Sequence, residues 1–381
     1  MAQKLYFVAG EHSGDTRGAE LMESLHALRP NWEFHGLGGP KMRERAGPEL
    51  TDWVEEAAVV GLWEVLKRYS WFKTRFEETR RAIEDLHPAA VVFIDYPGFN
   101  LRLARSLHES KTPIRLIDYI SPQVWAWNKA RIPRMASWLD LMLCLFPFEK
   151  EIFERAGLPT VCMGHPLVDQ LEAKRIEGGR EKDLIGLFPG SRDREVERLF
   201  PVMVEVAAGL HERYPGWRFE ASAASPPLED CMRSIVDAKG AGSVPIEIVG
   251  GRSQELMQRA WSGVVASGTA TLEATYYGMP YCLVYKVAWP TYLIGRTVVD
   301  IEHIGMANIL AGREIVHEFI QHEANAGNLS AFLESVMTDE VRRSELVGNL
   351  RETAKKLGGG GAAGVAAGAI VDLVEGDRNG H

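Results

Sequence analysis

The sequence has few of the residues and patterns that mark several protein classes. No uncharged run approaches the roughly 20 apolar residues of a membrane span, and the N-terminus lacks the pattern of a signal peptide. We therefore expect a protein that is made and kept in the cytoplasm. Its four cysteines include no Cys-x-x-Cys pair, which favours reduced thiols over a disulfide framework: Cys144, Cys162, Cys231 and Cys282.

Other absences narrow the classes of ligand. With a formal net charge of −9, the chain is not expected to bind nucleic acid. The first strand-like segment is not followed by Gly-x-Gly-x-x-Gly, which argues against a dinucleotide coenzyme. The histidines lack the spacing of a metal site, and the sequence contains no Asp-x-Asp motif. No metal and no cofactor is therefore expected.

The residues that are present are typical of a globular α/β protein. A length of 381 residues predicts two domains. Short apolar runs alternate with amphipathic stretches, which predicts two Rossmann-like domains with parallel sheets and helices on both faces. The predicted strands are residues 5–9, 90–94, 114–119, 141–146, 160–163, 185–188, 218–221, 246–249, 263–266 and 281–285, and the clearest helices are residues 18–28, 101–110, 148–156 and 196–213.

The domain boundary is predicted near residues 165–183, where a charged segment contains two glycines. This gives a first domain at residues 1–168 and a second at residues 169–350. The remaining residues, 351–381, include a helix that follows four glycines. The sequence leaves open whether this helix crosses back to the first domain or caps the second.

Ligands of open parallel sheets bind outside the carboxyl ends of the strands, so loops that follow predicted strands are candidate sites. In the loop of residues 10–15, small residues and a helix start favour an anionic ligand. The alternative is a plain turn capped by Ser13 or Asp15. In the loop of residues 94–100, Asp95 is placed to act as a general base, although a turn or helix cap is the commoner use of such a residue.

Two loops of the second half combine glycine, hydroxyl groups and charge as a diphosphate site requires. Glycine permits close backbone approach, Arg192 can pair with phosphate, and Glu273 can accept both hydroxyls of a ribose. The alternatives are a tight turn with a surface arginine and a carboxylate that favours the helix dipole. The predicted nucleotide-diphosphate site consists of Gly190, Ser191, Arg192, Ser267, Gly268, Thr269, Ala270, Thr271 and Glu273.

Residues 59–72 combine large apolar side chains with neighbouring lysines and arginines. This composition is typical of a helix that lies on a membrane surface. From the residues alone, a buried helix with a solvated face is the favoured alternative.

Ten short motifs, in order and across nearly the whole chain, resemble the lipid-A-disaccharide synthase family. Ten ordered matches are far more specific than a single glycine loop. The sequence departs from the family at Met306 and Ala307, where Leu-Pro is common, and near His317, where a proline is common. The motifs are GEHSGD at 10–15, GLGGPKM at 36–42, VGLWEVL at 60–66, IDYPGFN at 94–100, SPQVWAW at 121–127, FPFE at 146–149, GHP at 164–166, PGSR at 189–192, SGTATLE at 267–273 and NILAGR at 308–313.

The resemblance implies a GT-B fold, in which the two sheets face a central cleft, and an inverting hexosyltransferase. Such an enzyme moves 2,3-diacylglucosamine from UDP-2,3-diacylglucosamine to the 6-hydroxyl of 2,3-diacylglucosamine 1-phosphate (lipid X). The products are lipid A disaccharide 1-phosphate and UDP. The resemblance also implies a peripheral position on the cytoplasmic face of the inner membrane of a Gram-negative bacterium, and it allows a homodimer with exchanged C-terminal segments.

Residue roles follow from the same resemblance. It implies that Asp95 is the general base, that Glu11 is an acceptor-side acid and that Asn308 belongs to the donor site with Arg192 and Glu273. Since no metal is expected, backbone amides, hydroxyls and Arg192 would stabilise the leaving diphosphate. Acylated substrates also favour the membrane interpretation of residues 59–72. The predicted acceptor-side residues are Ser13, Gly14 and Asp15, and the predicted membrane contacts are Val59, Leu62, Trp63, Leu66, Trp71 and Phe72.

Other functions stay open on the residues. They are transfer of N-acetylglucosamine to a different lipid, epimerisation of a UDP-sugar, and non-catalytic binding of a UDP-sugar or lipid. A Rossmann oxidoreductase is disfavoured by the missing dinucleotide fingerprint.

Overall fold

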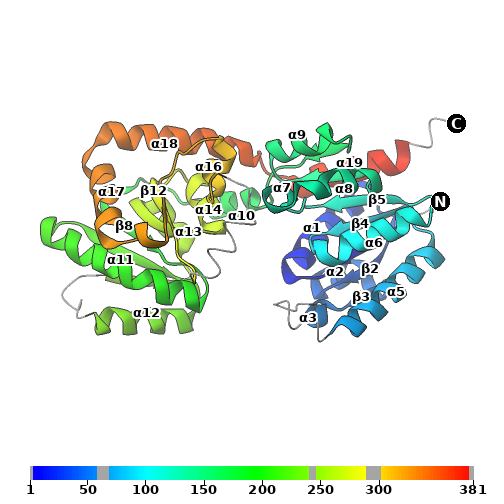
Figure 1. The fold of residues 1–381 in the computed structure, drawn as a ribbon, viewed down its shortest axis with the longest axis horizontal. Coiled ribbons are helices and arrows are strands. Elements are labelled where there is room, and N and C mark those ends of the chain that lie inside the picture. Colours follow the sequence, from blue (N-terminus) through cyan, green and yellow to red (C-terminus); the bar gives the residue numbers. More distant parts are fainter. Residues whose placement is uncertain (1–2, 58–67, 240–245, 289–301, 377–381) are drawn as a thin grey trace. The chain divides into compact units, whose positions relative to one another are not determined.

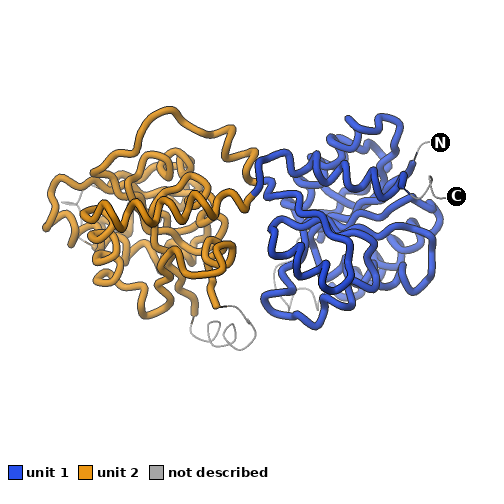
Figure 2. The backbone as a smooth tube through the Cα atoms, turned by 90° about the horizontal axis from the view of Figure 1, so that it is seen from above, with its two compact units in different colours: residues 1–166, 358–381 blue, residues 167–357 orange. Residues whose placement is uncertain are grey.

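The computed structural model describes residues 3–57, 68–239, 246–288 and 302–376 (Figure 1). The chain divides into two compact units (Figure 2). Unit 1 consists of Met1–Pro166 and Gly358–His381, and unit 2 consists of Leu167–Leu357. Each unit has its own parallel sheet and its own core, and each is described by itself.

The sheet of unit 1 has the strand order β3-β2-β1-β4-β5-β6-β7, and all neighbouring strands are parallel. Strand order reverses at β1, whose neighbours are β2 and β4. Loops diverge at such a reversal, which leaves a crevice at the carboxyl ends of β1 and β4. The strands are β1 Lys4–Ala9, β2 Glu33–Gly38, β3 Leu50–Asp52, β4 Ala90–Ile94, β5 Arg115–Tyr119, β6 Leu141–Cys144 and β7 Thr160–Cys162.

Helices pack on this sheet because its strands carry apolar side chains on both faces, as is usual for parallel sheets. The main core cluster joins β1, β2, β4, β5 and β6 to α1 and α19. Helix α6 contacts α5 and α8 outside this cluster. The helices of unit 1 are α1 His12–Leu28, α2 Pro40–Ala46, α3 Val54–Ala57, α5 Tyr69–Leu86, α6 Pro97–Glu109, α7 Val124–Trp127, α8 Ile132–Trp138, α9 Pro147–Arg155 and α19 Ala362–Gly376.

The C-terminal helix α19 belongs to unit 1, so the chain returns to the unit in which it begins (Figure 2). It packs on α1, and Glu375 accepts two hydrogen bonds from Arg29, at 2.7 and 2.5 Å. One helical stretch of the described residues, Glu340–Gly376, has the length and hydropathy of a membrane span. Glycines interrupt it at residues 358–361, and its second half is the α19 core helix, which buries Ile370 fully.

The sheet of unit 2 repeats the same plan, with the strand order β10-β9-β8-β11-β12-β13 and parallel neighbours. Its order reverses at β8, so the crevice lies at the carboxyl ends of β8 and β11. The strands are β8 Glu181–Phe188, β9 Arg218–Ala223, β10 Ile246–Gly250, β11 Ala260–Ala266, β12 Tyr281–Tyr285 and β13 Glu318–Ile320. The helices are α10 Leu167–Ala173, α11 Asp193–Arg213, α12 Pro226–Ala238, α13 Ser253–Arg259, α14 Thr269–Tyr276, α16 Met306–Ala311, α17 Ala326–Thr338 and α18 Glu340–Ala354.

Three strands escape the sequence prediction. Strand β2 reads EFHGLG, and a Cβ atom on its Gly36 would collide with the backbone of Phe7, so glycine is needed for close approach to β1. Strands β3 and β13 have three residues each, too few to leave a periodic pattern. The linker predicted at residues 165–183 is also shorter, because α10 and β8 occupy most of it.

Candidate active site

Tyr96 joins the two loops at the strand-order reversal of unit 1. Its ring lies against Gly10, where a Cβ atom would come 2.5 Å from the ring, and its hydroxyl donates to the Ala57 carbonyl at 3.0 Å. The loops hold the two carboxylates singled out by the sequence. Glu11 follows β1 and is exposed, whereas Asp95 follows β4 and is half-buried.

Asp95 lies in a turn that the rest of its motif holds in place. Asp95 and Tyr96 have φ angles of 47° and 53°, in the left-handed region that residues other than glycine seldom adopt. The buried amide of Asn100 donates to the Asp95 carbonyl at 2.6 Å, and Pro97 fixes the first turn of α6. The Tyr96 N–H donates to Oδ1 of Asp95 at 2.9 Å, so Oδ2 is the oxygen left to accept a proton.

Three carboxyl groups interact at this edge of the sheet. Burial raises the pKa of Asp95, against the smaller effect of the Tyr96 N–H. Burial and then the Asp95 charge raise the pKa of Glu11. Asp118 pairs with Phe93 across β4 and β5 and is 4% exposed. Burial and then the Asp95 charge raise the pKa of Asp118 well above its usual range. Grouped acids with raised pKa values are typical of sites that transfer protons.

Asp15, which the sequence predicts to be an acceptor-side residue, is held by hydrogen bonds within unit 1. Its carboxylate is 2% exposed and accepts three backbone N–H groups of residues 39–42, at 2.9 to 3.1 Å. A Cβ atom on Gly39 would lie 2.7 Å from this carboxylate, which explains the glycine. Asp15 thus joins the first loop to the start of α2. Ser13 is exposed and Gly14 is buried.

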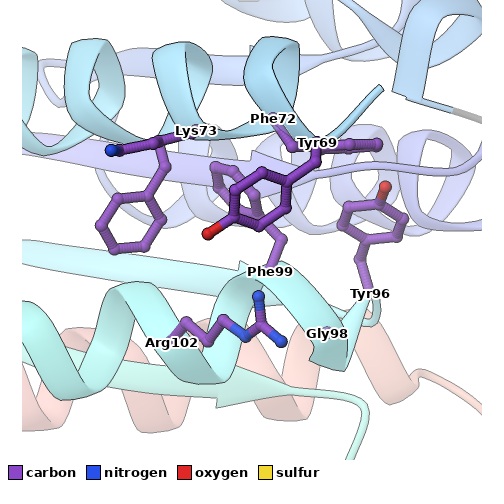
Figure 3. A pocket seen from close by; sticks show the side chains of 8 residues that line it. Tyr69, Phe72, Lys73, Tyr96, Gly98, Phe99 and Arg102 are labelled. Carbon is purple, nitrogen blue, oxygen red and sulfur yellow. The ribbon is translucent and has the colours of Figure 1, made fainter. Parts of the chain in front are cut away.

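An apolar pocket of about 400 Å³ opens beside Tyr96 between α5 and α6. Figure 3 shows aromatic rings around it and the cationic groups of Lys73 and Arg102 nearby. Trp53 packs edge-on against Tyr96 and Phe99, with ring centroids 6.1 and 5.1 Å apart, and its Nε1 donates to the Ala9 carbonyl. The sequence did not predict this pocket, which is lined by Tyr69, Phe72, Lys73, Phe76, Tyr96, Gly98, Phe99 and Arg102.

Glu149 links two motifs for which the sequence suggested no contact. It is 1% exposed, and it accepts hydrogen bonds from Trp125 Nε1 at 3.0 Å and from the Phe146 N–H at 3.1 Å. Burial raises its pKa, and these hydrogen bonds oppose the change. Glu149 therefore fixes the loop after β5 and the start of α9, and it has a positioning role.

In unit 2, residues 189–192 form the turn between β8 and α11. Gly190 has a φ angle of 111°, and a side chain there would collide with Glu195. The Glu195 carboxylate accepts the Ser191 N–H at 3.2 Å and pairs with Arg192 at 3.1 Å. An internal carboxylate thus holds the groups that an anionic phosphate would use. The Arg192 side chain is otherwise 83% exposed.

The loop after β11 presents part of the predicted phosphate site. Gly268 has a φ angle of 144° and is exposed, as is Thr269, while Ser267 and Ala270 are half-buried. Thr271 differs from the prediction. It is 1% exposed, and its hydroxyl donates to the Gly268 carbonyl at 2.7 Å, so it closes the first turn of α14.

Glu273 is oriented by residues that the sequence did not single out. Gln254 Nε2 donates to its carboxylate at 3.3 Å, and Lys174 Nζ donates to Gln254 Oε1 at 3.0 Å. Burial raises the pKa of Glu273, while Gln254 and the Lys174 charge act in the opposite direction. Gln254 lies on α13, which follows another strand end, and only the fold brings it to Glu273.

Asn308, which the sequence predicts to belong to the donor site, lies in a network of internal hydrogen bonds. The side chain is 1% exposed and its hydrogen bonds are all internal. Nδ2 donates to Val316 O and to Glu318, at 2.7 and 2.8 Å, and Oδ1 accepts the N–H groups of Ile315 and Val316. An amide has no further hydrogen-bonding capacity after four such bonds. Asn308 therefore fixes the chain between α16 and β13, and α16 forms despite Met306 and Ala307.

Four of the predicted membrane contacts, Val59, Leu62, Trp63 and Leu66, lie outside the described residues. The other two are half-buried. Trp71 stacks on Trp53 with centroids 6.0 Å apart, and Phe72 lines the apolar pocket. These two side chains therefore pack within unit 1, and among the described residues next to them Tyr69 is an exposed aromatic residue.

Two parallel sheets, each with a reversal of strand order and a loop pair at its carboxyl edge, define a GT-B protein, the fold class of many nucleotide-sugar enzymes. Among the described residues, no group of three or more His, Cys, Asp or Glu side chains could hold a metal ion. Solved structures share the fold. A UDP-GlcNAc 2-epimerase from Neisseria meningitidis, bound to UDP-GlcNAc, has a TM-score of 0.53 at 12% identity, covering 97% of this chain and 98% of that one. A ugt transferase from Siraitia grosvenorii, in complex with UDP, has a TM-score of 0.57 at 12% identity, covering 97% and 99%.

The sequence comparisons are more specific. The family model of lipid-A-disaccharide synthetase matches residues 5–357. The lipid-A-disaccharide synthase of Geobacter sulfurreducens is 36% identical over 384 residues, and that of Trichlorobacter lovleyi 34% over 381 residues, each covering 98% of both chains. The chain belongs to the lipid-A-disaccharide synthetase family and is a glycosyltransferase of lipid A biosynthesis. The family resemblance and the fold class predicted from the sequence are thereby confirmed.

The contact between Gly10 and Tyr96 can be tested by stability. Gly10→Ala places a methyl group 2.5 Å from the Tyr96 ring, which is too close. We therefore expect overpacking to lower the free energy of unfolding by about 1–3 kcal/mol. Gly98→Ala, in open space on α6, should be neutral or slightly stabilising. Urea denaturation measures both, and equal stability of the two variants would contradict the packing of Tyr96 on Gly10.

Proposed function

We propose that the chain transfers 2,3-diacylglucosamine from UDP-2,3-diacylglucosamine to the 6-hydroxyl of 2,3-diacylglucosamine 1-phosphate (lipid X), with inversion at the anomeric carbon. In this proposal unit 1 binds the acceptor and unit 2 binds the donor. Family membership supports the reaction, and the structural neighbours solved with UDP or UDP-GlcNAc support the donor class. The observation that carries the proposal is the group of carboxyls with raised pKa values at the reversal of the unit 1 sheet.

Asp95 is the general base of the proposed reaction. Its Oδ2 takes the proton of the acceptor hydroxyl as the hydroxyl oxygen attacks the anomeric carbon. The bond from that carbon to the diphosphate breaks, and its electron pair leaves with UDP. A single displacement of this kind inverts the configuration. Glu11, which is exposed and interacts electrostatically with Asp95, holds the acceptor sugar by hydrogen bonds.

The donor loops stabilise the diphosphate that leaves. Backbone N–H groups at residues 190–192 and 267–269 and the Arg192 guanidinium meet the developing charge. When the donor binds, a phosphate takes the place of the Glu195 carboxylate at Ser191 and Arg192. One anionic group thus replaces another at these donors. Glu273, oriented by Gln254, accepts the ribose hydroxyls. Asn308 acts through the loop geometry alone.

Asp95→Asn tests the base. We expect turnover to fall by about 10²–10⁴-fold, because the amide cannot accept the proton, while UDP affinity is unchanged. Asp85→Asn, an exposed carboxylate at the end of α5, is the matched control. Release of UDP and formation of the disaccharide are measured together from the two acylated substrates. Near-normal turnover of Asp95→Asn would exclude the base role, and UDP release without disaccharide would indicate hydrolysis.

The pH dependence belongs to the same prediction. Only the ionised carboxylate can accept a proton, so kcat/KM should fall as the pH falls. Burial raises the pKa of Asp95 above its ordinary value of 3.8, so the decline should begin at a higher pH than for an exposed aspartate. In Asp95→Asn the acid limb of the profile should disappear or move.

We further propose that the apolar pocket beside Tyr96 holds an acyl chain of the acceptor. Its aromatic walls suit a hydrocarbon chain, and Tyr96 places the pocket next to Asp95. Each methylene group that leaves water for such a pocket contributes about 0.8 kcal/mol. Lys73 and Arg102 at its margin suit the negative charge of the acceptor phosphate.

Gly98→Leu tests this pocket, because the position lines it and faces open space. Excluding two to four methylene groups should lower kcat/KM for long-chain acceptors by about 10–200-fold. Acceptors with short acyl chains should be affected little. Gly209→Leu, also helical and open but in unit 2, is the control. An equal loss for short and long chains would contradict the assignment.

We also propose that residues 59–72 bring the protein to a membrane surface. Composition supports this proposal, since apolar residues there adjoin Lys67 and Arg68, and the substrates are acylated. Among the described neighbours, Tyr69 is 61% exposed and suits the interface between water and lipid.

Joint replacement of Val59, Leu62, Trp63 and Leu66 by serine should lower sedimentation with anionic vesicles at least about tenfold, since each apolar side chain withdrawn from lipid costs about 1.5–3 kcal/mol. Val341→Ser with Val365→Ser, which removes exposed valines elsewhere, should bind as the wild type does. Unchanged binding of the fourfold variant would contradict a membrane role for this segment.

A further inference from the structure

Besides the apolar pocket of unit 1, the structure has a pocket of about 390 Å³ in unit 2, which lies away from the donor loops. It is found where strands begin: Arg180 precedes β8, Trp261 stands near the start of β11, and Gly278 precedes β12. The donor loops follow the carboxyl ends of the same strands, so the two places are on opposite edges of the sheet. We refer to this second place as the arginine pocket.

The arginine pocket is strongly basic within an acidic chain. Arg175, Arg180, Arg343 and Arg351 line it, and its lining includes no aspartate or glutamate. Arg175 is paired with Glu172 at 3.0 Å. The structure gives the other three arginines no carboxylate within 4.0 Å among the described residues. A chain with 52 acidic and 43 basic residues could readily supply a partner, yet within the described ranges none of these three arginines forms an ion pair with a carboxylate.

Arg180 and Arg343 differ in what they contact. Arg180 donates to the carbonyls of Met257, Gln258, Ala260 and Tyr277, at 2.6 to 3.1 Å, and so ties the starts of neighbouring strands together. The guanidinium of Arg343 lies on the face of Trp261, 3.4 Å from the ring centroid. Its Nε is buried and has no hydrogen-bond partner. Arg180 thus has a structural role. Arg343 is fixed on Trp261, where its Nη2 donates one long hydrogen bond to the Trp261 carbonyl at 3.4 Å, while its Nε donor is unused.

Placing these cations close together raises the electrostatic free energy of the folded protein, and folding alone does not explain this cost. Burial, followed by the charges of Arg343 and Arg351, lowers the pKa of Arg180 to about 10. Burial also lowers the pKa of Arg343, the Glu340 charge opposes this change, and the Arg351 charge adds to the lowering. Mutual repulsion of cations in a partly buried pocket is relieved when an anion binds among them. Guanidinium groups offer paired N–H donors that match the oxygens of a phosphate.

We propose that the arginine pocket is a second anion site, separate from the donor site, which binds a phosphate group through Arg343 and Arg351. The phosphate belongs either to a small soluble molecule or to a lipid headgroup. The glycines at residues 178 and 179, where a side chain would meet nothing within 4 Å, leave the mouth open to such a ligand. Trp261 holds Arg343 ready for it, so little side-chain freedom is lost on binding.

The test uses the full chain saturated with UDP, which fills the donor site, and titrates inorganic pyrophosphate at constant ionic strength by calorimetry. The wild type should show one binding event. Arg343→Gln with Arg351→Gln should weaken it at least tenfold. Arg342→Gln with Arg233→Gln removes the same charge from exposed positions and should leave the affinity within about twofold.

A second arm identifies the source of the phosphate. Vesicles of phosphatidylcholine with or without phosphatidic acid are sedimented with the same three proteins. A loss of phosphatidic acid-dependent binding in Arg343→Gln with Arg351→Gln, but not in the control pair, assigns the pocket to a lipid headgroup. Binding of pyrophosphate alone assigns it to a soluble ligand. The proposal is overturned if the wild type binds neither probe, or if the Arg343 and Arg351 variant binds both as the wild type does. Each outcome is independent of the transferase assay.

Discussion

The reversal of strand order within each parallel sheet is the constraint on which the rest of the structure depends. Because β1 lies between β2 and β4, and β8 between β9 and β11, the loops that leave these strands diverge, and no crossover covers the crevice between them. Backbone N–H groups, glycines and acids at these four strand ends are therefore accessible. Glu11, Asp95, Gly190 and Gly268 all follow strands of this set, which is why loops far apart in the sequence form two compact sites.

Strand ends were predictable because alternating apolar runs reveal parallel sheets, and the ordered motifs then identified the family. Side-chain direction was not predictable. Asp15, Thr271 and Asn308 stand in the right loops, yet they are buried and satisfied by hydrogen bonds within the protein. A motif shows that a residue matters at a position, and it does not show whether the residue contacts a ligand or holds the loop that does. Only the hydrogen-bond partners separate these roles.

Residues that support the site were invisible in the sequence for a related reason. Gln254, Glu149 and Trp53 act on side chains that lie at least 19 residues away along the chain. The arginine pocket is spread from residue 175 to residue 351, so no local window contains it. The Asp95 turn is different, because Pro97 and Asn100 are within its own motif. The left-handed φ of Asp95 follows from this tight turn. Predicting the turn would have required knowing that the Asn100 amide donates to the Asp95 carbonyl.

The arginines of unit 2 illustrate two ways in which a protein prepares for an anion. Arg192 is 83% exposed and paired with Glu195, so in the proposed donor site a diphosphate would displace a carboxylate and order an exposed side chain before it gains the full interaction. In the proposed reaction this exchange would lower the net affinity for the donor, which suits an enzyme that releases UDP after every turnover. Arg343 is held on Trp261 with a buried donor unused, and the described residues give it no ion pair, so a bound anion there would displace no carboxylate. A site of the second kind favours retention over turnover, and its place at the edge opposite the donor loops fits a ligand that stays bound while donors come and go.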